Sequence, residues 1–427
     1  MIAIIPARYS STRLPGKMLL PIAGRPLILH TVERAKLAKT VDRVIVATDD
    51  ERIFDAVVES GSEAVMTSED HRSGSDRIAE VAEGLPGGSI IVNVQGDEPN
   101  ISPETIDRAV EAMLSDKPDV VTVSEPLSSL HGELLNFNVV KVVATEDGRA
   151  LYFSRSPMPF PQDASMRHGG DPNWALQREP ELFENFKKHS GLYVYSREFV
   201  LEFTKWPQTR LELFESLEQL RALEHGADIR LVQSAAPSIG VDTAEDLDRV
   251  RMLIEFPSIS FRTANEADIA AVADVYMETV RDAYSGVLPA EYLDGLSVDK
   301  RYEVHKKRRG AHESYHLLVA EDRERGVVGF IDRAEMPTDN FELDAHIFSF
   351  YVKPEFQGRG LGGLMFRKTL RQLKNEGCGS VGLDTFETNP FRSFYEKAGG
   401  VVIHSGEHLS DHEFPTVVYA WKDLSRI

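Results

Sequence analysis

The sequence predicts an α/β protein of two domains, an N-terminal domain built on a mostly parallel sheet and a C-terminal α+β domain. An apolar run at residues 2–6, a polar loop, a helical pattern at 26–38 and a second apolar run at 41–48 form a βαβ unit. After Pro257 the pattern restarts with a new set of strands. Because 427 residues suffice for two cores, we expect domains at residues 1–256 and 257–427.

The amino-acid composition restricts the classes of molecule that this protein is expected to bind. The chain has 48 Lys and Arg against 68 Asp and Glu, a net charge of −20, which repels nucleic acid and anionic membranes and favours small-molecule partners. Its single cysteine, Cys378, excludes an internal disulfide and a cysteine zinc cluster. The sequence shows no signal peptide and no long apolar span, so we expect a cytoplasmic protein without membrane insertion.

The loop after the first strand has the composition of a phosphate site. The run at 2–6 reads as a strand buried on both faces, so the loop lies at the carboxyl edge of a parallel sheet, where ligands bind. Its polar and cationic residues can approach and neutralise a triphosphate. They are Arg8, Ser10, Ser11, Arg13, Gly16 and Lys17. The spacing of a P-loop is absent, which argues against an ordinary ATPase, and the alternative is a solvated basic turn.

Two later segments present polar groups at the same edge. The loop 68–77 leads into a helix at 78–83 and can contact a base or ribose; the alternative is a plain helix cap by Ser75 or Asp76. The buried strand pattern at 89–94 ends near Asp97, and a carboxylate at a sheet edge suits Mg²⁺, which takes few protein ligands.

The remaining N-terminal pattern continues the sheet. Further strands are predicted at residues 120–124, 139–143, 151–153 and 189–195. The Pro-rich stretch 157–184 reads as an irregular loop over the site or an oligomer contact, and 211–221 as one amphipathic helix with a solvated carboxylate face. Asp242 comes just before a helix, where Asp242 or Thr243 can also be only the N-cap.

At this point the residues resemble the family of 3-deoxy-manno-octulosonate (Kdo) cytidylyltransferases, from Met1 to about Glu255. The resemblance rests on eight collinear blocks: IPARYSSTRLPGK, VATDD, MTSEDHRSGSDR, VNVQGDEP, LYFSR, HSGLY, LEQLR and GVDTAEDL. It implies a Rossmann-like nucleotidyltransferase fold, usually as a homodimer. It also implies that the anomeric hydroxyl of Kdo attacks the α-phosphorus of CTP while pyrophosphate leaves.

The matching positions imply roles for particular residues. The triphosphate would be held by Arg8, Ser11, Arg13 and Lys17. Near the nucleotide would lie Ser73, Asp76 and Arg77. The sugar side would be lined by Gln95, Arg155, His189, Tyr193, Glu212 and Glu215. Asp97 and Asp242 would hold Mg²⁺ and, with Lys17, act in catalysis. Ser190 and Ser196 stand where an apolar and a basic residue are expected, which leaves the exact ulosonic acid open.

The C-terminal half carries a second resemblance. Strands are predicted at 317–320, 327–331 and 343–352, followed by a Gly-rich turn and a helix at 364–376. Such a turn exposes N–H groups that can bind a pyrophosphate. With the segment from Asn389 to Gly399, this turn resembles the GNAT acetyltransferases over residues 259–422.

The GNAT resemblance implies transfer of an acetyl group from acetyl-CoA to an amine. The cofactor side would comprise Val352, Gln357, Arg359, Gly360, Gly362, Gly363 and Asn389. Tyr395 would be the acid for the leaving thiolate; the alternative is a core aromatic with its hydroxyl satisfied. Arg392 and Gly400 depart from the family pattern, and Glu342, Asp344 and His346 are unranked candidates for the base.

Two alternatives remain open at this stage. The N-terminal domain can act on another acid, such as a sialic-type or amino-substituted sugar or a phosphonate, and the C-terminal domain can be a non-catalytic binding or dimerisation module. Kdo itself offers only hydroxyls, whereas the GNAT resemblance implies an amine acceptor. The fusion therefore suggests that the acetyl acceptor is an amino-substituted relative of Kdo or its CMP ester.

Overall fold

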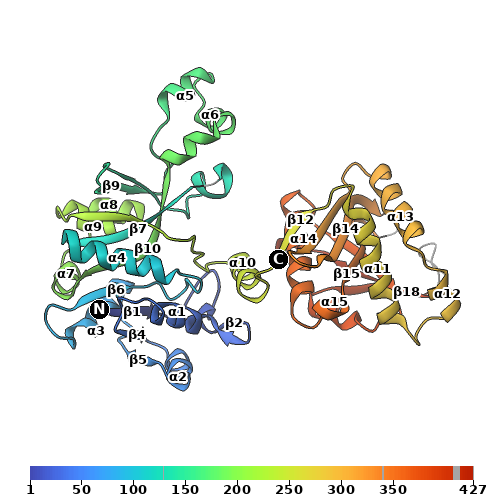
Figure 1. The fold of residues 1–427 in the computed structure, drawn as a ribbon, viewed down its shortest axis with the longest axis horizontal. Coiled ribbons are helices and arrows are strands. Elements are labelled where there is room, and N and C mark those ends of the chain that lie inside the picture. The colour runs from blue at the N-terminus through green and yellow to red at the C-terminus, as the bar shows by residue number, and fades with distance from the viewer. Residues whose placement is uncertain (128, 339–340, 407–413, 427) are drawn as a thin grey trace. The chain divides into compact units, whose positions relative to one another are not determined.

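The structure is a computed structural model that describes residues 1–127, 129–338, 341–406 and 414–426. The chain forms two compact units, Met1–Ile254 and Glu255–Ile427 (Figure 1). In the described part of the chain, no helix has the length and apolar character needed to span a membrane.

The N-terminal unit is organised around a nine-stranded sheet. Seven strands follow the order β11-β7-β10-β6-β1-β4-β5, and β8 pairs with both β10 and β9. The strands are β1 (Ile2–Ala7), β4 (Arg43–Thr48), β5 (Glu63–Met66), β6 (Ile90–Asn93), β7 (Val120–Pro126), β8 (Lys141–Ala144), β9 (Ala150–Ser154), β10 (Lys187–Ser196) and β11 (Ile229–Gln233). A small hairpin, β2 (Pro21–Ile22) with β3 (Arg25–Pro26), lies apart from this sheet.

The predicted parallel core of the sheet is confirmed. β1 pairs in parallel with β4 on one side and β6 on the other, so that Ile4 lies opposite both Ile45 and Asn93. The carboxyl ends of these strands therefore meet at one edge, from which the loops at 8–16 and 94–102 leave. The sheet is mixed, because β10 runs antiparallel between β6 and β7.

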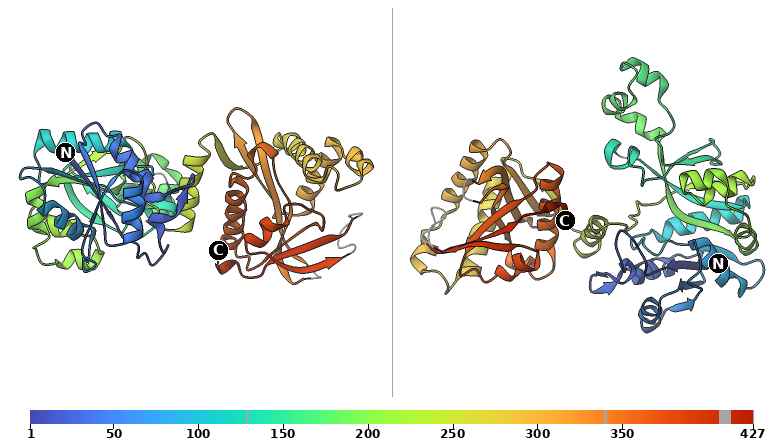
Figure 2. Two further views of the ribbon diagram at one scale, coloured as in Figure 1. Left: turned by 90° about the horizontal axis from the view of Figure 1, so that it is seen from below. Right: turned by 180° about the vertical axis from the view of Figure 1, so that it is seen from behind.

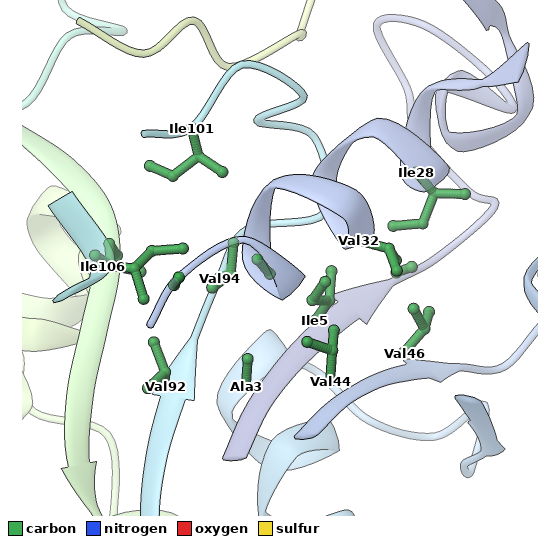
Figure 3. Packing of buried hydrophobic residues seen from close by; sticks show 14 of the residues in the cluster. Ala3, Ile5, Ile28, Val32, Val44, Val46, Val92, Val94, Ile101 and Ile106 are labelled. Carbon is green, nitrogen blue, oxygen red and sulfur yellow. The ribbon is translucent and has the colours of Figure 1, made fainter. Parts of the chain in front are cut away.

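Helices cover both faces of this sheet because successive residues of a buried strand point to opposite sides. Ala3 and Ile5 of β1 pack with Ile28 and Val32 of α1 (Figure 3). Ile4, which lies between them, belongs to a separate core on the opposite face. The helices are α1 (Leu27–Lys36), α2 (Glu51–Glu59), α3 (Gly74–Glu83), α4 (Pro103–Asp116), α7 (Arg197–Phe203), α8 (Arg210–Glu215), α9 (Gln219–Glu224) and α10 (Ala244–Glu255), with 3₁₀ helix η1 (Lys17–Leu19) and π-helix η2 (Leu130–Leu134).

Two predictions for this unit are wrong. The stretch 157–184 is not irregular: it forms α5 (Gln162–Arg167), α6 (Pro172–Arg178) and the start of η3 (Pro180–Asn185), which project from the sheet as an arm (Figures 1 and 2). Leu176 and Phe186 pack with leucines of η2, and this small core stabilises the arm. The helix predicted at 211–221 is broken into α8 and α9, because Ser216 adopts a left-handed conformation with φ of +55°.

The C-terminal unit contains a seven-stranded sheet of order β12-β13-β14-β15-β16-β18-β17. β15 and β16 pair in parallel, and the other neighbours are antiparallel. The strands are β12 (Ile259–Thr263), β13 (His316–Asp322), β14 (Gly326–Thr338), β15 (Leu343–Val352), β16 (Val381–Phe386), β17 (Val401–Gly406) and β18 (Thr416–Trp421).

Helices lie on both faces of this second sheet. Phe330 of β14 packs with α11, whereas a side chain at the adjacent Gly329 would contact Met365 of α14 on the other face. The elements are α11 (Asp268–Tyr284), α12 (Ala290–Gly295), α13 (Val298–Ala311), η4 (Pro354–Phe356), α14 (Leu361–Asn375), α15 (Arg392–Lys397) and η5 (Leu424–Arg426).

Candidate active sites

The first loop turns back sharply and presents Lys17 at the sheet edge. Gly16 has φ of +67°, and its N–H donates to the carbonyl of Tyr9 at 3.2 Å. A Cβ at position 16 would lie 3.0 Å from the Tyr9 ring, so this turn requires glycine. Ser11 accepts from the N–H of Leu14 at 3.4 Å, and Arg8 is exposed on the same loop. The loop is therefore an ordered turn whose backbone geometry positions Lys17.

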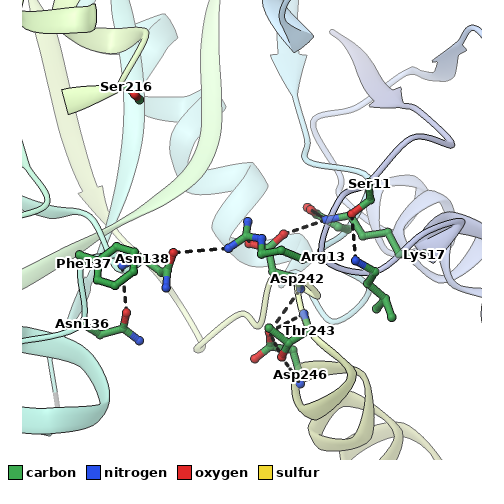
Figure 4. Close-up of polar contacts among 12 residues, drawn as sticks. Ser11, Arg13, Lys17, Asn136, Phe137, Asn138, Ser216, Asp242, Thr243 and Asp246 are labelled. Carbon is green, nitrogen blue, oxygen red and sulfur yellow. Dashed lines mark hydrogen bonds and ion pairs between the residues drawn. The ribbon is translucent and has the colours of Figure 1, made fainter. Parts of the chain in front are cut away.

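Lys17 joins two carboxylates that are far apart in the sequence. Its Nζ lies 2.5 Å from Oδ2 of Asp97 and 2.9 Å from Oδ1 of Asp242. Arg13 approaches Asp242 at 2.8 Å and donates to Asn138 at 3.4 Å (Figure 4). Burial of the Lys17 ammonium opposes its charge, but the two carboxylates outweigh that effect and raise the pKa of Lys17. The result is a cluster of two cations and two anions beside the first loop.

This cluster fits a divalent cation. Asp97 and Asp242 already face one positive charge, the ammonium of Lys17, from two sides. Within the described residues, no three or more His, Cys, Asp or Glu side chains are grouped as a metal site. Two carboxylates with the remaining positions left to phosphate and water are a donor set typical of Mg²⁺.

The helix that follows Asp242 does not use that residue as its cap. Thr243 accepts from the N–H of Asp246 at 3.2 Å, and Asp246 accepts in return from the N–H of Thr243 at 3.0 Å. This reciprocal pair satisfies the start of α10 in the manner of a capping box. The side chain of Asp242 is therefore left to Lys17 and Arg13 (Figure 4).

The nucleotide-side residues of the second loop have structural partners. Ser73 and Asp76 form a capping box at the start of α3, each accepting from the other's N–H at 3.2 Å. Arg77 is buried and pairs with Asp49 at 2.6 Å. The cap is therefore made by Ser73 with Asp76, and Ser75 instead donates to Glu218 at 2.6 Å.

A cavity of about 980 Å³ opens beside the cluster. Asp97 and Asp242 line it together with Gln95, His189 and Tyr193. Burial lowers the pKa of His189 to about 3, so its ring is neutral, and Nε2 lies 2.9 Å from the hydroxyl of Thr122. Burial also raises the pKa of Tyr193, which keeps its proton. This wall therefore offers neutral hydrogen-bonding groups next to the charged cluster.

Three of the expected sugar-side residues lie elsewhere. Glu212 is buried in a pair with Arg221, with 2.5 and 2.8 Å between their atoms. Glu215 accepts from the N–H of Arg155 at 3.0 Å, and Arg155 also donates to the carbonyl of Glu215 at 2.8 Å. The structure does not bring Arg155, Glu212 and Glu215 to the cavity wall. Their observed contacts hold α8 and α9 against the sheet.

Sequence reasoning missed several charged residues on the cavity wall. They include Glu98, Glu125, Glu133, Lys188 and Glu218. Glu98 follows Asp97 in the sequence, and Lys188 precedes His189. This adjacency to predicted site residues was the one local signal that they lie at the site. Glu125 and Glu133 had none, because their approach to Lys188 depends on the pairing of β7 with β10.

In the C-terminal unit, the two parallel strands separate at their carboxyl ends. β15 pairs with β16 only from Ala345 to Ile347, whereas β15 continues to Val352. The carbonyl of Val352 accepts from Nε2 of Gln357 at 2.7 Å, which fixes the start of the Gly-rich turn. Gly360 has φ of +97° immediately before α14, so the turn exposes the N-terminal N–H groups of that helix.

The remaining cofactor-side residues lie on this turn or on the neighbouring segment. A Cβ at Gly362 would meet the Phe350 ring at 3.2 Å, which keeps α14 close to β15. Gly363 follows in the first turn of α14, and the guanidinium of Arg359 lies over the Phe256 ring at 5.7 Å. Asn389 donates to Thr385 at 2.6 Å and accepts from the N–H of Phe391 at 2.8 Å, so its side chain orders the segment before α15.

Tyr395 is buried on α15. Burial raises the pKa of its hydroxyl, and the nearby Tyr284, Tyr419 and Asp384 raise it further. A phenol in this state keeps its proton and can donate a hydrogen bond. The departure at Gly400 has a steric reason, because a Cβ there would lie 2.7 Å from the Trp421 indole.

The structure distinguishes the three candidate bases. Asp344 accepts from the N–H groups of Gly379 and Ser380 at 2.8 and 2.9 Å, so it orders that turn. Glu342 is exposed with φ of +52°. His346 lies 2.8 Å from Asp384, one residue before the pairing of β15 with β16 ends. Of the three, His346 is the one held beside the divergence of the strands.

Comparison with known proteins identifies the N-terminal unit. The family model described as cytidylyltransferase matches residues 2–229. The chain belongs to the cytidylyltransferase family. It is 50% identical over 256 residues to the 3-deoxy-manno-octulosonate cytidylyltransferase of Trichlorobacter lovleyi, covering 59% of this chain and 97% of that protein. It is 51% identical over 254 residues to the enzyme of that name from Geobacter sulfurreducens, covering 58% and 96%.

Structural comparison agrees with this assignment. The structure of a CMP:2-keto-3-deoxy-manno-octonic acid synthetase complexed with CTP superposes with a TM-score of 0.52 and 39% identity, covering 59% of this chain and 97% of that one. Residues 277–400 match the family model of GNAT acetyltransferases. The cytidylyltransferase unit is thus followed by a GNAT domain, and both families consist of transferases.

Proposed function

We propose that the cytidylyltransferase unit transfers CMP from CTP to Kdo or a closely related ulosonic acid and releases pyrophosphate. The observation that carries this proposal is the convergence of Lys17, Asp97 and Asp242 beside a cavity whose wall includes the neutral polar groups of Gln95, His189 and Tyr193. The support for the substrate is the similarity to relatives named for Kdo, whose length this chain covers almost completely.

The reaction requires this chain to position the two substrates and to neutralise the charge of the phosphates. In-line attack on a phosphorus needs no protein nucleophile. Arg13 and Lys17 bring two positive charges to the site, while Asp97 and Asp242 would hold Mg²⁺. The metal, when bound, neutralises charge that develops on the phosphate oxygens. His189 is neutral, so it serves as a hydrogen-bonding group toward the sugar rather than as a cation.

The direct test supplies the full chain with CTP, Mg²⁺ and Kdo and measures pyrophosphate and CMP-Kdo. A panel of sialic-type acids and phosphonates under the same conditions decides the alternative acceptors. Turnover of a panel member with no turnover of Kdo or its close analogues would contradict the proposed substrate while retaining the reaction.

Arg13→Ala should weaken the binding of CTP. If the guanidinium makes one charge-assisted contact to phosphate, the affinity should fall by about 1.5–3 kcal/mol, or roughly 10- to 150-fold. Calorimetric titration of CTP into each variant measures this directly. Arg108→Ala, an exposed arginine of α4, is the control. An unchanged affinity for CTP would mean that the first loop is a solvated basic turn and not a phosphate site.

We further propose that residues 257–427 form an acetyl-CoA-dependent N-acetyltransferase. The support is the GNAT family match together with the separated ends of β15 and β16, the Gly-rich turn before α14, and the buried phenol of Tyr395. Binding of acetyl-CoA to the full chain, measured by calorimetry, tests the proposal. Failure to bind would favour the alternative of a non-catalytic module.

Tyr395→Phe should slow acetyl transfer without weakening the binding of acetyl-CoA. Loss of a general acid costs roughly 10²- to 10⁴-fold in rate. The rate of thiol release with amine acceptors and the affinity for acetyl-CoA are measured separately. A variant with full activity would show that Tyr395 is a core aromatic, the alternative reading of this residue.

We also propose a homodimer that uses the arm of the cytidylyltransferase unit. Phe160, Met166 and Trp174 are exposed there, at 59, 67 and 52% of their surface. Apolar groups gathered on a projecting element are typical of an interface. Trp174→Glu should shift the sedimentation coefficient from that of a dimer to that of a monomer, and a parent chain that sediments as a monomer would contradict this proposal.

A further inference from the structure

The cavity of the cytidylyltransferase unit has an acidic corner that the phosphate chemistry does not use. The corner consists of Glu98, Glu125, Glu133 and Lys188, all on the cavity wall. It contains three carboxyl groups and one ammonium. Asp97 and Asp242 face Lys17 and would hold the metal. They therefore do not explain why the corner carries these other charged residues. The substrates proposed above are anionic, and an acidic corner is the opposite of what an anion alone would need.

Glu125 is the most deeply buried member of the corner. It is the second-to-last residue of β7, opposite Lys188 of β10, and 3% of its surface is exposed. Its Oε1 accepts from the N–H of Ser238 at 3.1 Å. Its Oε2 lies 3.2 Å from the ammonium of Lys188, which Glu125 shares with Glu133. One ammonium shared by two carboxylates leaves part of their negative charge unbalanced, which favours a further cation in this corner.

Glu98 adds a second buried carboxyl group, close enough to Glu125 and Lys188 to interact with them. It is 8% exposed, and its Oε2 is buried with no hydrogen-bond partner in the part of the chain that the structure describes. The wall of the cavity therefore contains a carboxyl group with an oxygen that lacks a donor.

The corner is already built around one ammonium. Nζ of Lys188 lies 2.7 Å from Oε1 of Glu133 and 3.2 Å from Oε2 of Glu125. Burial opposes the charge of Lys188, but the two glutamates outweigh it and raise the pKa of Lys188. One lysine does not balance the carboxylates of both Glu125 and Glu133. The adjacent His189 is neutral, and Ser190 contributes a small polar side chain to the wall, so neither adds positive charge.

We propose that this corner binds an ammonium group on the acidic sugar, so that the preferred acceptor of CMP is an amino-substituted ulosonic acid. This inference rests on the proposed cytidylyl transfer. In the complex the ammonium donates to Glu98, whose Oε2 lacks a donor, and to Glu125, and it balances the negative charge of the corner. The presence of an acetyltransferase that modifies amines in the same chain agrees with such a substrate, although a fusion is an associational argument.

The test measures kcat/KM for pyrophosphate release by the full chain with Kdo and with Kdo analogues in which one hydroxyl at a time is replaced by an amine. At least one amino analogue should exceed Kdo by about tenfold or more, the gain of a charge-assisted hydrogen bond over a neutral one. Glu125→Gln should reduce that ratio by a similar factor. Glu133→Gln is a second variant in a less buried position, and Glu146→Gln, exposed between β8 and β9, is the matched control.

The outcomes separate the two proposals. If Kdo is used as well as or better than every amino analogue, the ammonium site is wrong while cytidylyl transfer stands. If the parent chain prefers an amino analogue but both Glu125→Gln and Glu133→Gln retain the full ratio, the preference arises elsewhere and the corner is wrong. If neither Kdo nor any analogue yields pyrophosphate, both proposals fail. Calorimetric binding of CTP to each variant shows that the site is folded.

Discussion

Replacing Asp97 or Asp242 by asparagine is expected to reduce cytidylyl transfer by about 10³-fold or more, comparable to the loss of a group that stabilises charge in a transition state. Each substitution removes one of the two negative charges that face Lys17 and would hold Mg²⁺. It also leaves Lys17 with a single carboxylate partner, so the position of the ammonium is less well defined. The rate of pyrophosphate release at saturating CTP and Mg²⁺ measures the effect.

The matched control is Asp55→Asn, an exposed aspartate on α2 outside the cavity. It should retain the parent rate, and all three variants should unfold at similar denaturant concentrations. If either site variant turned over at a near-normal rate with Mg²⁺, the assignment of the two carboxylates to the metal would be wrong.

Asp332→Asn should destabilise the C-terminal unit by about 3 kcal/mol, since removal of one partner of a buried charge pair leaves the other uncompensated. Asp332 on β14 is fully buried and accepts from Arg308 at 3.0 Å and from the Tyr315 hydroxyl at 3.1 Å. Nδ1 of His305 lies 3.4 Å away. Arg308 is 24% exposed in its side chain, which moderates the cost.

Urea unfolding of the full chain, followed by a probe in the C-terminal unit, measures this loss against Asp274→Asn, an exposed aspartate on α11. The pH dependence gives a second check. Burial opposes the charge of Asp332, but its hydrogen-bonded and cationic partners outweigh it and lower the pKa of this carboxyl. Its contribution is therefore present above its ordinary pKa near 4 and is lost as the pH falls below that value. Equal stability of the two variants at pH 7 would contradict the proposed role of this cluster.

Several features of this protein were determined by sequence alone. The apolar runs that became β1, β4 and β6, and the loops at their carboxyl ends, were predictable because burial on both faces of a strand produces an unbroken run of apolar residues. The resemblance to the two families could also be recognised from the sequence, since each family motif is a contiguous stretch of residues. Asp97 was predicted as a metal ligand from its place after a strand, whereas the role of Asp242 came only from the family resemblance, since its position before a helix also suited an N-cap.

Other features depended on contacts between distant segments. The division of 211–221 into two helices depends on the left-handed conformation of Ser216. The residue types in this segment do not predict that conformation. Glu212 reads as a solvated or substrate-binding carboxylate until Arg221 is seen beside it in the fold. The arm at 157–184 is helical because leucines of η2 pack against it, which a Pro-rich composition conceals.

The acidic corner of the cavity was decided by tertiary structure in the same way. Glu125, Glu133 and Lys188 meet only after β10 has inserted antiparallel beside β7, and Lys17 reaches Asp97 and Asp242 across 80 and 225 residues of sequence. Local pattern reports which side chains are buried and which backbone segments are regular. It does not predict which charges form ion pairs. An ion pair requires two side chains to be close in space, and these side chains become close only when the sheet has formed.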